Sequence, residues 1–241
     1  EAAKQTGLLA THSVDTSDVT VAGGWNDTTF VPFDQGHFAF IYNSETLSNP
    51  PTSLKDVVEN QGLRVIYQDP RTSTPGLGLL LWMKSVYGDD VSDAWESLAS
   101  HTVTVTKSWS DAYGLFLKGE ADVVLSYTTS PAYHIIAEGE SKYKAASASE
   151  GLYPQVELAA MMKSAPNPAL AQRFMQFILQ PEFQSVIPTG NWMLPVVESS
   201  EPLPAAFDSA LLPTKNLVLP AKEVAKNRKA WVDEWLNATT R

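Results

Sequence analysis

The stretch Val65-Ile-Tyr-Gln-Asp-Pro-Arg-Thr-Ser-Thr-Pro-Gly-Leu-Gly-Leu-Leu-Leu-Trp-Met83 contains the local pattern that decides the fold. Its first residues, Val65-Ile-Tyr67, are apolar, and with the flanking Arg64 and Gln68 they predict a strand over 64–68. Asp69 to Thr74 is rich in turn residues, and Pro75 is suited to the first turn of a helix that Gly88 would end. The stretch therefore predicts a strand, a turn and a helix in direct succession.

The same order recurs twice further along the chain. Thr102–Thr106 alternates as a strand does, and a short helix is expected over Asp111–Lys118. Asp122–Tyr127 predicts a third strand, followed by a helix over Pro131–Ala137. Strands that alternate with helices favour an α/β fold with a parallel sheet.

Two further extended segments, Gly36–Tyr42 and Tyr153–Ala160, lie on either side of this block. A chain that leaves one lobe, builds a second and returns would have this arrangement, with a hinge at the paired crossings. We therefore expect three segments. They are 1–42, with the remnant of one lobe and the first crossing; 43–150, a complete α/β middle lobe; and 151–241, the return crossing and the rest of the first lobe.

The last helix is expected over about Ala221 to Asn237, with Val224, Trp231 and Trp235 on one stripe. A tryptophan pair at that spacing favours a packing face over a ligand site. A helix capped by Asn167 should run to Leu179, with Phe174, Phe177 and Ile178 on its apolar face.

Composition excludes several classes of protein. The 241 residues include no cysteine, which removes disulfide scaffolds, iron–sulfur clusters and thiolate metal sites. The net charge of −10 has the wrong sign for a nucleic-acid binder. The longest apolar run, 77–83, is far below the roughly 20 residues of a membrane span.

The first residues lack a signal peptide and predict the end of a helix, as if the chain began inside an existing element.

Hydroxyl side chains gather at the three strand-to-helix turns. Thr72-Ser-Thr-Pro75 and Thr128-Thr-Ser-Pro131 each place hydroxyls before a proline, and Ser110 precedes a third helix start. In open α/β sheets ligands bind beyond the carboxyl ends of the strands, where these turns lie. Such hydroxyls can simply cap a helix, but they can also hold a polar or anionic ligand.

Aromatic residues lie in or near the same turns: Trp109, Tyr127 and Tyr133. Aromatic rings beside hydroxyl-rich helix starts suit a flat heterocycle or a cation with a polar tail. Core packing is the competing interpretation for Tyr127, which continues a strand, and for Tyr133, which can face the sheet.

Enzymatic interpretations have little support in the sequence. The phosphate-binding loop, the paired-histidine zinc motif and the serine nucleophile elbow are all missing. The four histidines (His12, His37, His101, His134) are scattered without metal-ligand spacing. A serine hydrolase or transferase that uses Ser73 or Ser130 would need a histidine within hydrogen-bond reach, and we expect none.

Four long motifs resemble the periplasmic thiamine-binding proteins of bacterial ABC importers. They begin at Gly23-Gly-Trp-Asn-Asp-Thr-Thr-Phe, at Val65-Ile-Tyr-Gln-Asp-Pro-Arg, at Leu125-Ser-Tyr-Thr-Thr-Ser-Pro-Ala-Tyr-His134 and at Ile187-Pro-Thr-Gly-Asn-Trp-Met193. The resemblance covers nearly the whole chain. It implies a two-lobed type II solute-binding fold with hinge strands that closes on thiamine, thiamine monophosphate or thiamine diphosphate.

The resemblance also implies the ligand contacts. Ser73 and Thr74 would meet the phosphate or hydroxyethyl end, Trp109 would contact the rings, and Tyr133 would stack on the pyrimidine or thiazolium. The cleft would further be lined by Tyr127, Thr128, Thr129 and Ser130.

The resemblance further implies the partners, the location and the absence of catalysis. The partners would be an ABC permease and its ATPase, the location the periplasm, and the protein neither an enzyme nor dependent on a cofactor. The first part of the N-terminal lobe, with a signal peptide and an acidic-glycine ligand loop, would be absent from this sequence. The alternatives are a binding protein for another cationic small molecule or a metal, and the serine-dependent enzyme.

Overall fold

The computed structural model describes residues 2–240, and the chain forms two compact units. Unit 1 holds the chain up to Gly36 together with Gln155–Ala205. Unit 2 holds His37–Pro154 and the chain from Ala206 onward. Two of the unit boundaries fall in or beside β1 (Phe30–Asn43) and β6 (Pro154–Ala160), two long strands that pair with each other.

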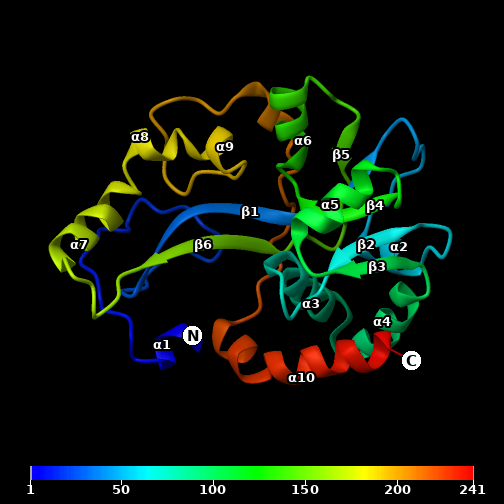
Figure 1. The fold of residues 1–241 in the computed structure, drawn as a ribbon, viewed down its shortest axis with the longest axis horizontal. Helices are drawn as coiled ribbons and strands as arrows, with labels where there is room; N and C mark the ends of the chain where they lie inside the picture. Colours follow the sequence, from blue (N-terminus) through cyan, green and yellow to red (C-terminus); the bar gives the residue numbers. More distant parts are fainter. Residues whose placement is uncertain (1, 241) are drawn as a thin grey trace. The chain divides into compact units, whose positions relative to one another are not determined.

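Unit 2 is built on a sheet whose centre is parallel, as the sequence predicts. β2 (Val65–Gln68) pairs in parallel with β3 (Thr102–Thr106) and with β4 (Val123–Tyr127). β1 then adds to β4 in the antiparallel direction, and the short β5 (Tyr143–Ala145) adds to β1. The order β3-β2-β4-β1-β5 makes a mixed sheet (Figure 1).

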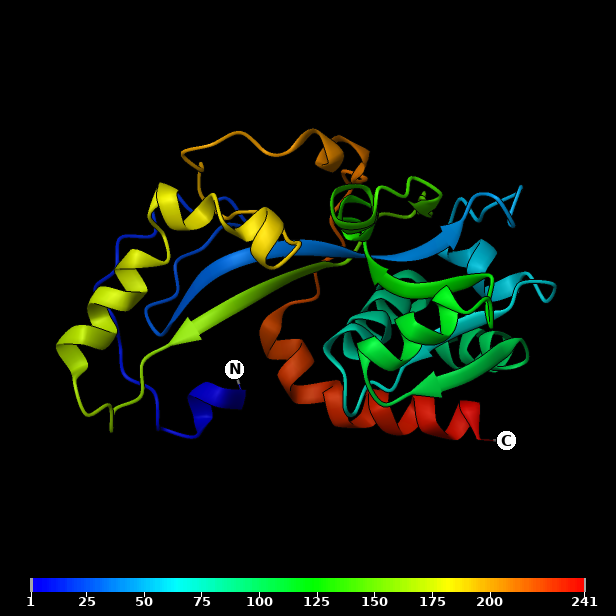
Figure 2. The same cartoon turned by 45° about the horizontal axis from the view of Figure 1, so that its top comes forward.

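Helices cover both faces of this sheet (Figure 2). Alternate residues of the central strands belong to two different cores: Val65 and Tyr67 to one, Ile66 to the other. The period of two along a strand explains this division, and burial on both faces explains why these strands are almost entirely apolar. The helices of unit 2 are α2 (Leu54–Glu59), α3 (Thr74–Tyr87), α4 (Val91–Ala99), α5 (Trp109–Leu117), α6 (Ser130–Tyr133) and α10 (Ala221–Thr239).

Several of these helices begin and end as their sequences predict. Ser53 caps α2 by accepting a hydrogen bond from the Asp56 backbone N–H at 2.8 Å. α3 ends at Gly88, which has a φ of +57° that glycine adopts without strain. A 3-10 turn (Gly88–Asp90) then leads into α4, a helix that was not predicted from the sequence. Further along the chain, α6 continues into a π-helical turn (His134–Glu138).

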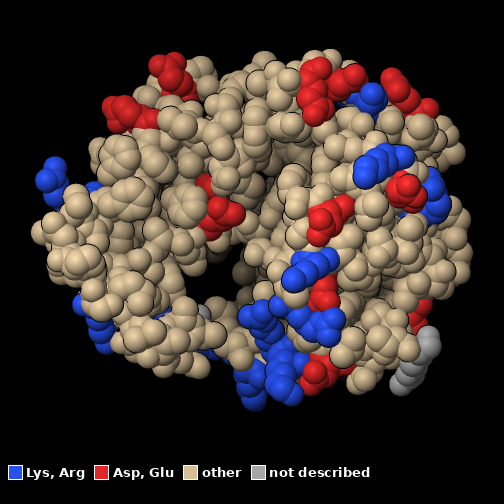
Figure 3. Space-filling view, in the orientation of Figure 1, with Lys and Arg blue, Asp and Glu red and all other residues tan. Residues whose placement is uncertain are grey.

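The tryptophan stripe of α10 is a packing face, as predicted. Trp231 and Trp235 are buried in the core of unit 2, and the Trp235 indole donates a hydrogen bond to the Tyr67 hydroxyl at 3.2 Å. α10 therefore belongs to unit 2, whereas the three segments expected from the sequence grouped it with the other lobe. Lysine and arginine side chains gather over the first half of this helix (Figure 3), despite the net negative charge of the chain.

Unit 1 packs helices on the paired strands β1 and β6. Its helices are α1 (Ala2–Gln5), α7 (Pro168–Phe177), α8 (Pro181–Gln184) and α9 (Ile187–Gly190), and a 3-10 turn at Ala205–Ser209 begins where the chain passes back to unit 2. Gln184 is fully buried and makes three backbone hydrogen bonds, to Phe33 O, Ile178 O and Val196 N, at 2.7 to 2.8 Å. These bonds fix α8 to the strand and to the following loop.

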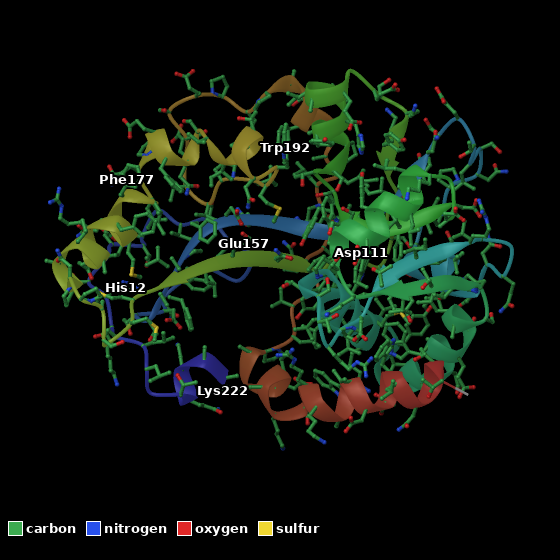
Figure 4. All side chains as sticks on the ribbon, viewed as in Figure 1. His12, Asp111, Glu157, Phe177, Trp192 and Lys222 are labelled. Carbon is green, nitrogen blue, oxygen red and sulfur yellow. The ribbon has the colours of Figure 1, made fainter. Side chains whose placement is uncertain are left out.

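The prediction for the apolar face of α7 is wrong for its two phenylalanines. Asn167 does cap the helix, but Phe174 and Phe177 are 54% and 51% exposed, and Phe177 projects from α7 in Figure 4. The prediction is confirmed for Ile178, which is buried and packs with Met175 on Val31. A spacing of three residues fits both stripes, so the sequence pattern alone does not distinguish them. Among residues 2–240, no helix is long and apolar enough to cross a membrane.

Candidate ligand-binding site

The three hydroxyl-rich turns lie at one edge of the sheet in unit 2. β2, β3 and β4 are parallel, so the turns that follow them leave the sheet at the same side. Hydrogen bonds also link the turns directly. The Thr72 hydroxyl donates to the Lys107 carbonyl at 2.7 Å, and the Trp109 indole donates to the Ser126 hydroxyl at 2.9 Å. The structure therefore brings together the residues that the sequence selected.

The first turn leads into α3. Ser73 occupies the N-cap position with extended backbone, but its hydroxyl makes no cap hydrogen bond. Ser73 is half-buried and Thr74 is exposed. An N-cap hydroxyl that is not used on its own helix leaves the N–H groups of the first turn and the hydroxyl itself open to a ligand.

The second turn leads into α5, and its cap is Ser108, so the helix start predicted at Ser110 is two residues too late. Ser108 accepts a hydrogen bond from the Asp111 backbone N–H at 3.2 Å and donates to the Asp111 carboxylate at 2.7 Å. Trp109 becomes the first helical residue and is 39% exposed. Its ring stacks on Tyr113, one turn later, with centroids 5.0 Å apart.

The third turn follows β4 and holds the most buried hydroxyls. Thr128 and Thr129 are each 1% exposed, and neither hydroxyl has a hydrogen-bond partner among the described residues. Ser130 is bonded to the Ser126 hydroxyl at 2.7 Å and accepts from the Tyr127 backbone N–H at 3.3 Å. A buried hydroxyl without a partner costs free energy, so the pair of threonines marks a place where a ligand or water would be stabilised.

The two tyrosines of this region have different aromatic neighbours. The Tyr127 ring packs on Phe38 with centroids 5.4 Å apart, in keeping with the packing alternative, while the residue remains half-buried. Tyr133, at the end of α6, is also half-buried and meets the edge of His134 at 5.1 Å.

Sequence reasoning missed a second layer of polar residues beneath the turns. Ser126 is fully buried in β4, and Tyr113 and His134 are buried beside it. The His134 Nε2 lies 2.8 Å from the Tyr113 hydroxyl, and the His134 Nδ1 lies 2.6 Å from the Glu138 carboxylate. A serine inside an apolar strand and a histidine four residues before a glutamate were the available signals.

None of the four histidines is hydrogen-bonded to Ser73 or Ser130 in residues 2–240. His12 and His101 bond to backbone carbonyls, and His37 bonds to the Asn216 side chain at 2.7 Å. Burial lowers the pKa of His37, which favours the neutral imidazole. No group of three or more metal-ligating side chains is found in that described part of the chain.

Unit 1 contains a buried carboxyl that the sequence did not single out. Asp34 in β1 is fully buried and accepts a hydrogen bond from the Asn191 amide at 2.6 Å, while its second oxygen has no hydrogen-bond partner among residues 2–240. The same amide lies 3.3 Å from Glu157 on β6. Burial raises the pKa of Asp34 to about 7; the Asn191 hydrogen bond opposes this rise and the charge of Glu157 adds to it.

Trp192, which follows Asn191 in the chain, has a strained backbone. Its φ of +57° is in the left-handed region, which costs a tryptophan about 1 to 3 kcal/mol. Figure 4 places Glu157 on β6 and Trp192 just after α9. Strain of this kind is concentrated at functional sites, so Trp192 joins the candidate residues, and the bonds of Asn191 to Asp34 and Glu157 help to hold the turn.

The fold, with its paired crossing strands and its turns at the carboxyl ends of a parallel sheet, is that of a class of proteins that bind a solute. The chain belongs to the bacterial extracellular solute-binding proteins, whose family model matches residues 2–214. Among characterised relatives, the thiamine-binding periplasmic protein of Escherichia coli K12 is 58% identical over the whole of this chain and 73% of its own length. The protein of the same description from Brucella melitensis is 53% identical over 99% of this chain and 72% of its own length.

Solved structures agree with this assignment. A periplasmic thiamin-binding protein, 58% identical, superposes with a TM-score of 0.95 over the whole of this chain and 75% of its own. A ferric binding protein from Campylobacter jejuni, at 17% identity and a TM-score of 0.82, shares the fold alone. The predicted solute-binding fold is therefore confirmed.

Proposed function

We propose that this protein is the periplasmic solute-binding component of an ABC importer, and that it captures thiamine, thiamine monophosphate or thiamine diphosphate for delivery to a permease and its ATPase. The observation that carries the proposal is the 58% identity, over the whole chain, to a thiamine-binding periplasmic protein. The hydroxyl and aromatic turns of unit 2 supply chemistry that suits this ligand.

Each part of the ligand has a matching group at these turns. The thiazolium ring is a permanent cation, and an aromatic face attracts a desolvated cation with about 2 kcal/mol. Trp109, 39% exposed, and the half-buried Tyr133 offer such faces. The phosphate or hydroxyethyl end suits Ser73 and Thr74, at the start of the 14-residue helix α3.

The remaining proposed contacts come from the third turn. Tyr127, Thr128, Thr129 and Ser130 follow one another at the end of β4, and the two threonine hydroxyls have no partner within residues 2–240. A ligand oxygen or ring nitrogen would satisfy them. The site then needs neither a metal nor a cofactor, because recognition depends on rings and hydroxyls.

Isothermal titration of the full-length protein with thiamine, its monophosphate and its diphosphate tests the proposal. We expect saturable one-to-one binding of at least one of the three. Trp109→Ala should weaken it about tenfold, because the stacking face is lost. Phe177→Ala, which removes an exposed aromatic ring from α7, is the control and should leave the affinity unchanged. The proposal fails if the unaltered protein binds none of the three compounds.

A further inference from the structure

A continuous set of polar and aromatic contacts runs beneath the candidate site in unit 2. At one end the Glu138 carboxylate lies 2.6 Å from His134 Nδ1, and His134 Nε2 lies 2.8 Å from the Tyr113 hydroxyl. The Tyr113 ring stacks on Trp109, whose indole donates to Ser126 at 2.9 Å. The Ser126 hydroxyl lies 2.7 Å from that of Ser130.

The chemistry of the Glu138 end fixes the direction of its hydrogen bonds. An ionised carboxylate only accepts, so His134 must donate from Nδ1. In the neutral ring Nε2 is then an acceptor, and the Tyr113 hydroxyl donates to it. Burial raises the pKa of Tyr113, and the neighbouring Ser130 hydroxyl opposes the rise only in part, so the phenol keeps its proton.

The chemistry of the Trp109 end fixes the remaining directions. An indole N–H only donates, so Ser126 accepts from Trp109. Ser126 is fully buried, and within residues 2–240 its proton has an acceptor in the Ser130 hydroxyl, 2.7 Å away. Ser130 therefore accepts twice, from Ser126 and from the Tyr127 backbone N–H, and its own proton can be donated to the neighbouring Tyr113 oxygen.

We propose that Glu138, His134, Tyr113 and Ser126 are positioning residues that hold the Trp109 ring in place for the ligand. The inference deepens the proposed function and rests on it for the identity of the ligand. The ligand ring that meets Trp109 then finds the indole held by Tyr113 on its face and by Ser126 at its N–H.

The packing around His134 suits a fixed ring. Its imidazole is fully buried, stacks on Tyr113 with centroids 5.7 Å apart, and lies 4.2 Å from the ring of Tyr143 and 5.1 Å from that of Tyr133. The ring therefore has little freedom to turn, and the carboxylate at Nδ1 selects the tautomer, as a carboxylate does for a histidine that supports a functional group.

Nitrogen NMR of the full-length, histidine-labelled protein tests the proton arrangement without any ligand. We expect long-range ¹H–¹⁵N spectra near neutral pH to show His134 protonated at Nδ1 and unprotonated at Nε2. A ring protonated at Nε2 would overturn the proposal. Because this readout needs no ligand, it decides the arrangement of protons even if thiamine fails to bind and the proposed function falls.

Titration with thiamine, or with whichever of its phosphates binds, tests the positioning role. Tyr113→Phe keeps the ring that stacks on Trp109 and removes only the hydroxyl. It should weaken binding about 3- to 10-fold, as expected for the loss of one buried hydrogen bond. Tyr143→Phe removes a hydroxyl from another ring packed on His134, and should change the affinity less than about twofold. Equal affinities for the two variants would contradict the role given to Tyr113.

Discussion

Gly76→Ala should destabilise the protein by about 3 kcal/mol, close to the upper end of what a single overpacked position costs. A Cβ at residue 76 would lie 2.3 Å from the Gln68 carbonyl oxygen and 2.7 Å from the Asp69 carbonyl group. These atoms are backbone at the end of β2, so no side chain can turn away to make room. Either α3 or the turn before it would have to shift.

Urea or thermal unfolding measures this effect. For a chain of this size the midpoint of thermal unfolding should fall by roughly 6 to 12 °C. Gly114→Ala is the matched control, because Gly114 lies inside α5 and a Cβ there meets no atom within 4 Å. That variant should be stabilised by about 0.5 to 1 kcal/mol, since alanine favours helix over glycine. A stability for Gly76→Ala equal to that of the unaltered protein would show that β2 and α3 do not approach as described.

Asp34→Asn should stabilise the protein by roughly 2 to 4 kcal/mol at pH 8, and by much less at pH 4. The pKa of Asp34 is raised to about 7 in the folded protein, chiefly by burial, and is near 3.8 when the chain unfolds. The ionised carboxyl is therefore disfavoured in the folded state. Stability falls as the pH rises from about 4 through 7, and asparagine removes this loss while still accepting from Asn191.

Urea unfolding at a series of pH values from 4 to 8 tests this prediction. The curves for the unaltered protein and Asp34→Asn should converge at low pH and separate as the pH rises. Asp18→Asn, which neutralises an exposed carboxyl of the same unit, should follow the unaltered protein throughout. Parallel curves for Asp34→Asn and the unaltered protein would mean that Asp34 does not titrate near neutral pH.

The fold was largely predictable because its elements carry local signals. The 65–83 stretch encodes a strand, a turn and a helix through apolar runs, turn residues and a proline at the helix start, and the structure has β2 and α3 in that place. The stripe at Trp231 and Trp235 was predictable for the same reason. α7 was not, because Phe174 and Phe177 have the same spacing as Met175 and Ile178, and only the position of β1 decides which stripe is buried.

The residues of the candidate site also fall into two groups, those that the sequence predicts and those that it does not. The turn hydroxyls and aromatic residues are close in sequence to strand ends, so the rule for parallel sheets found them. Ser126, Tyr113 and Glu138 come together only through the packing of β4, α5 and the turn after α6, and Asp34 meets Asn191 across 157 positions of sequence. No local pattern encodes such pairings, and Ser108 rather than Ser110 caps α5 because both serines satisfy the same sequence preference.

A crystal structure of the full-length protein with thiamine bound tests the central claim most directly. The account predicts that the thiamine rings lie against Trp109 and Tyr133, beside the turns that follow β2, β3 and β4. Thiamine held in the crystal without contact to the turns that follow β2, β3 and β4 would contradict it.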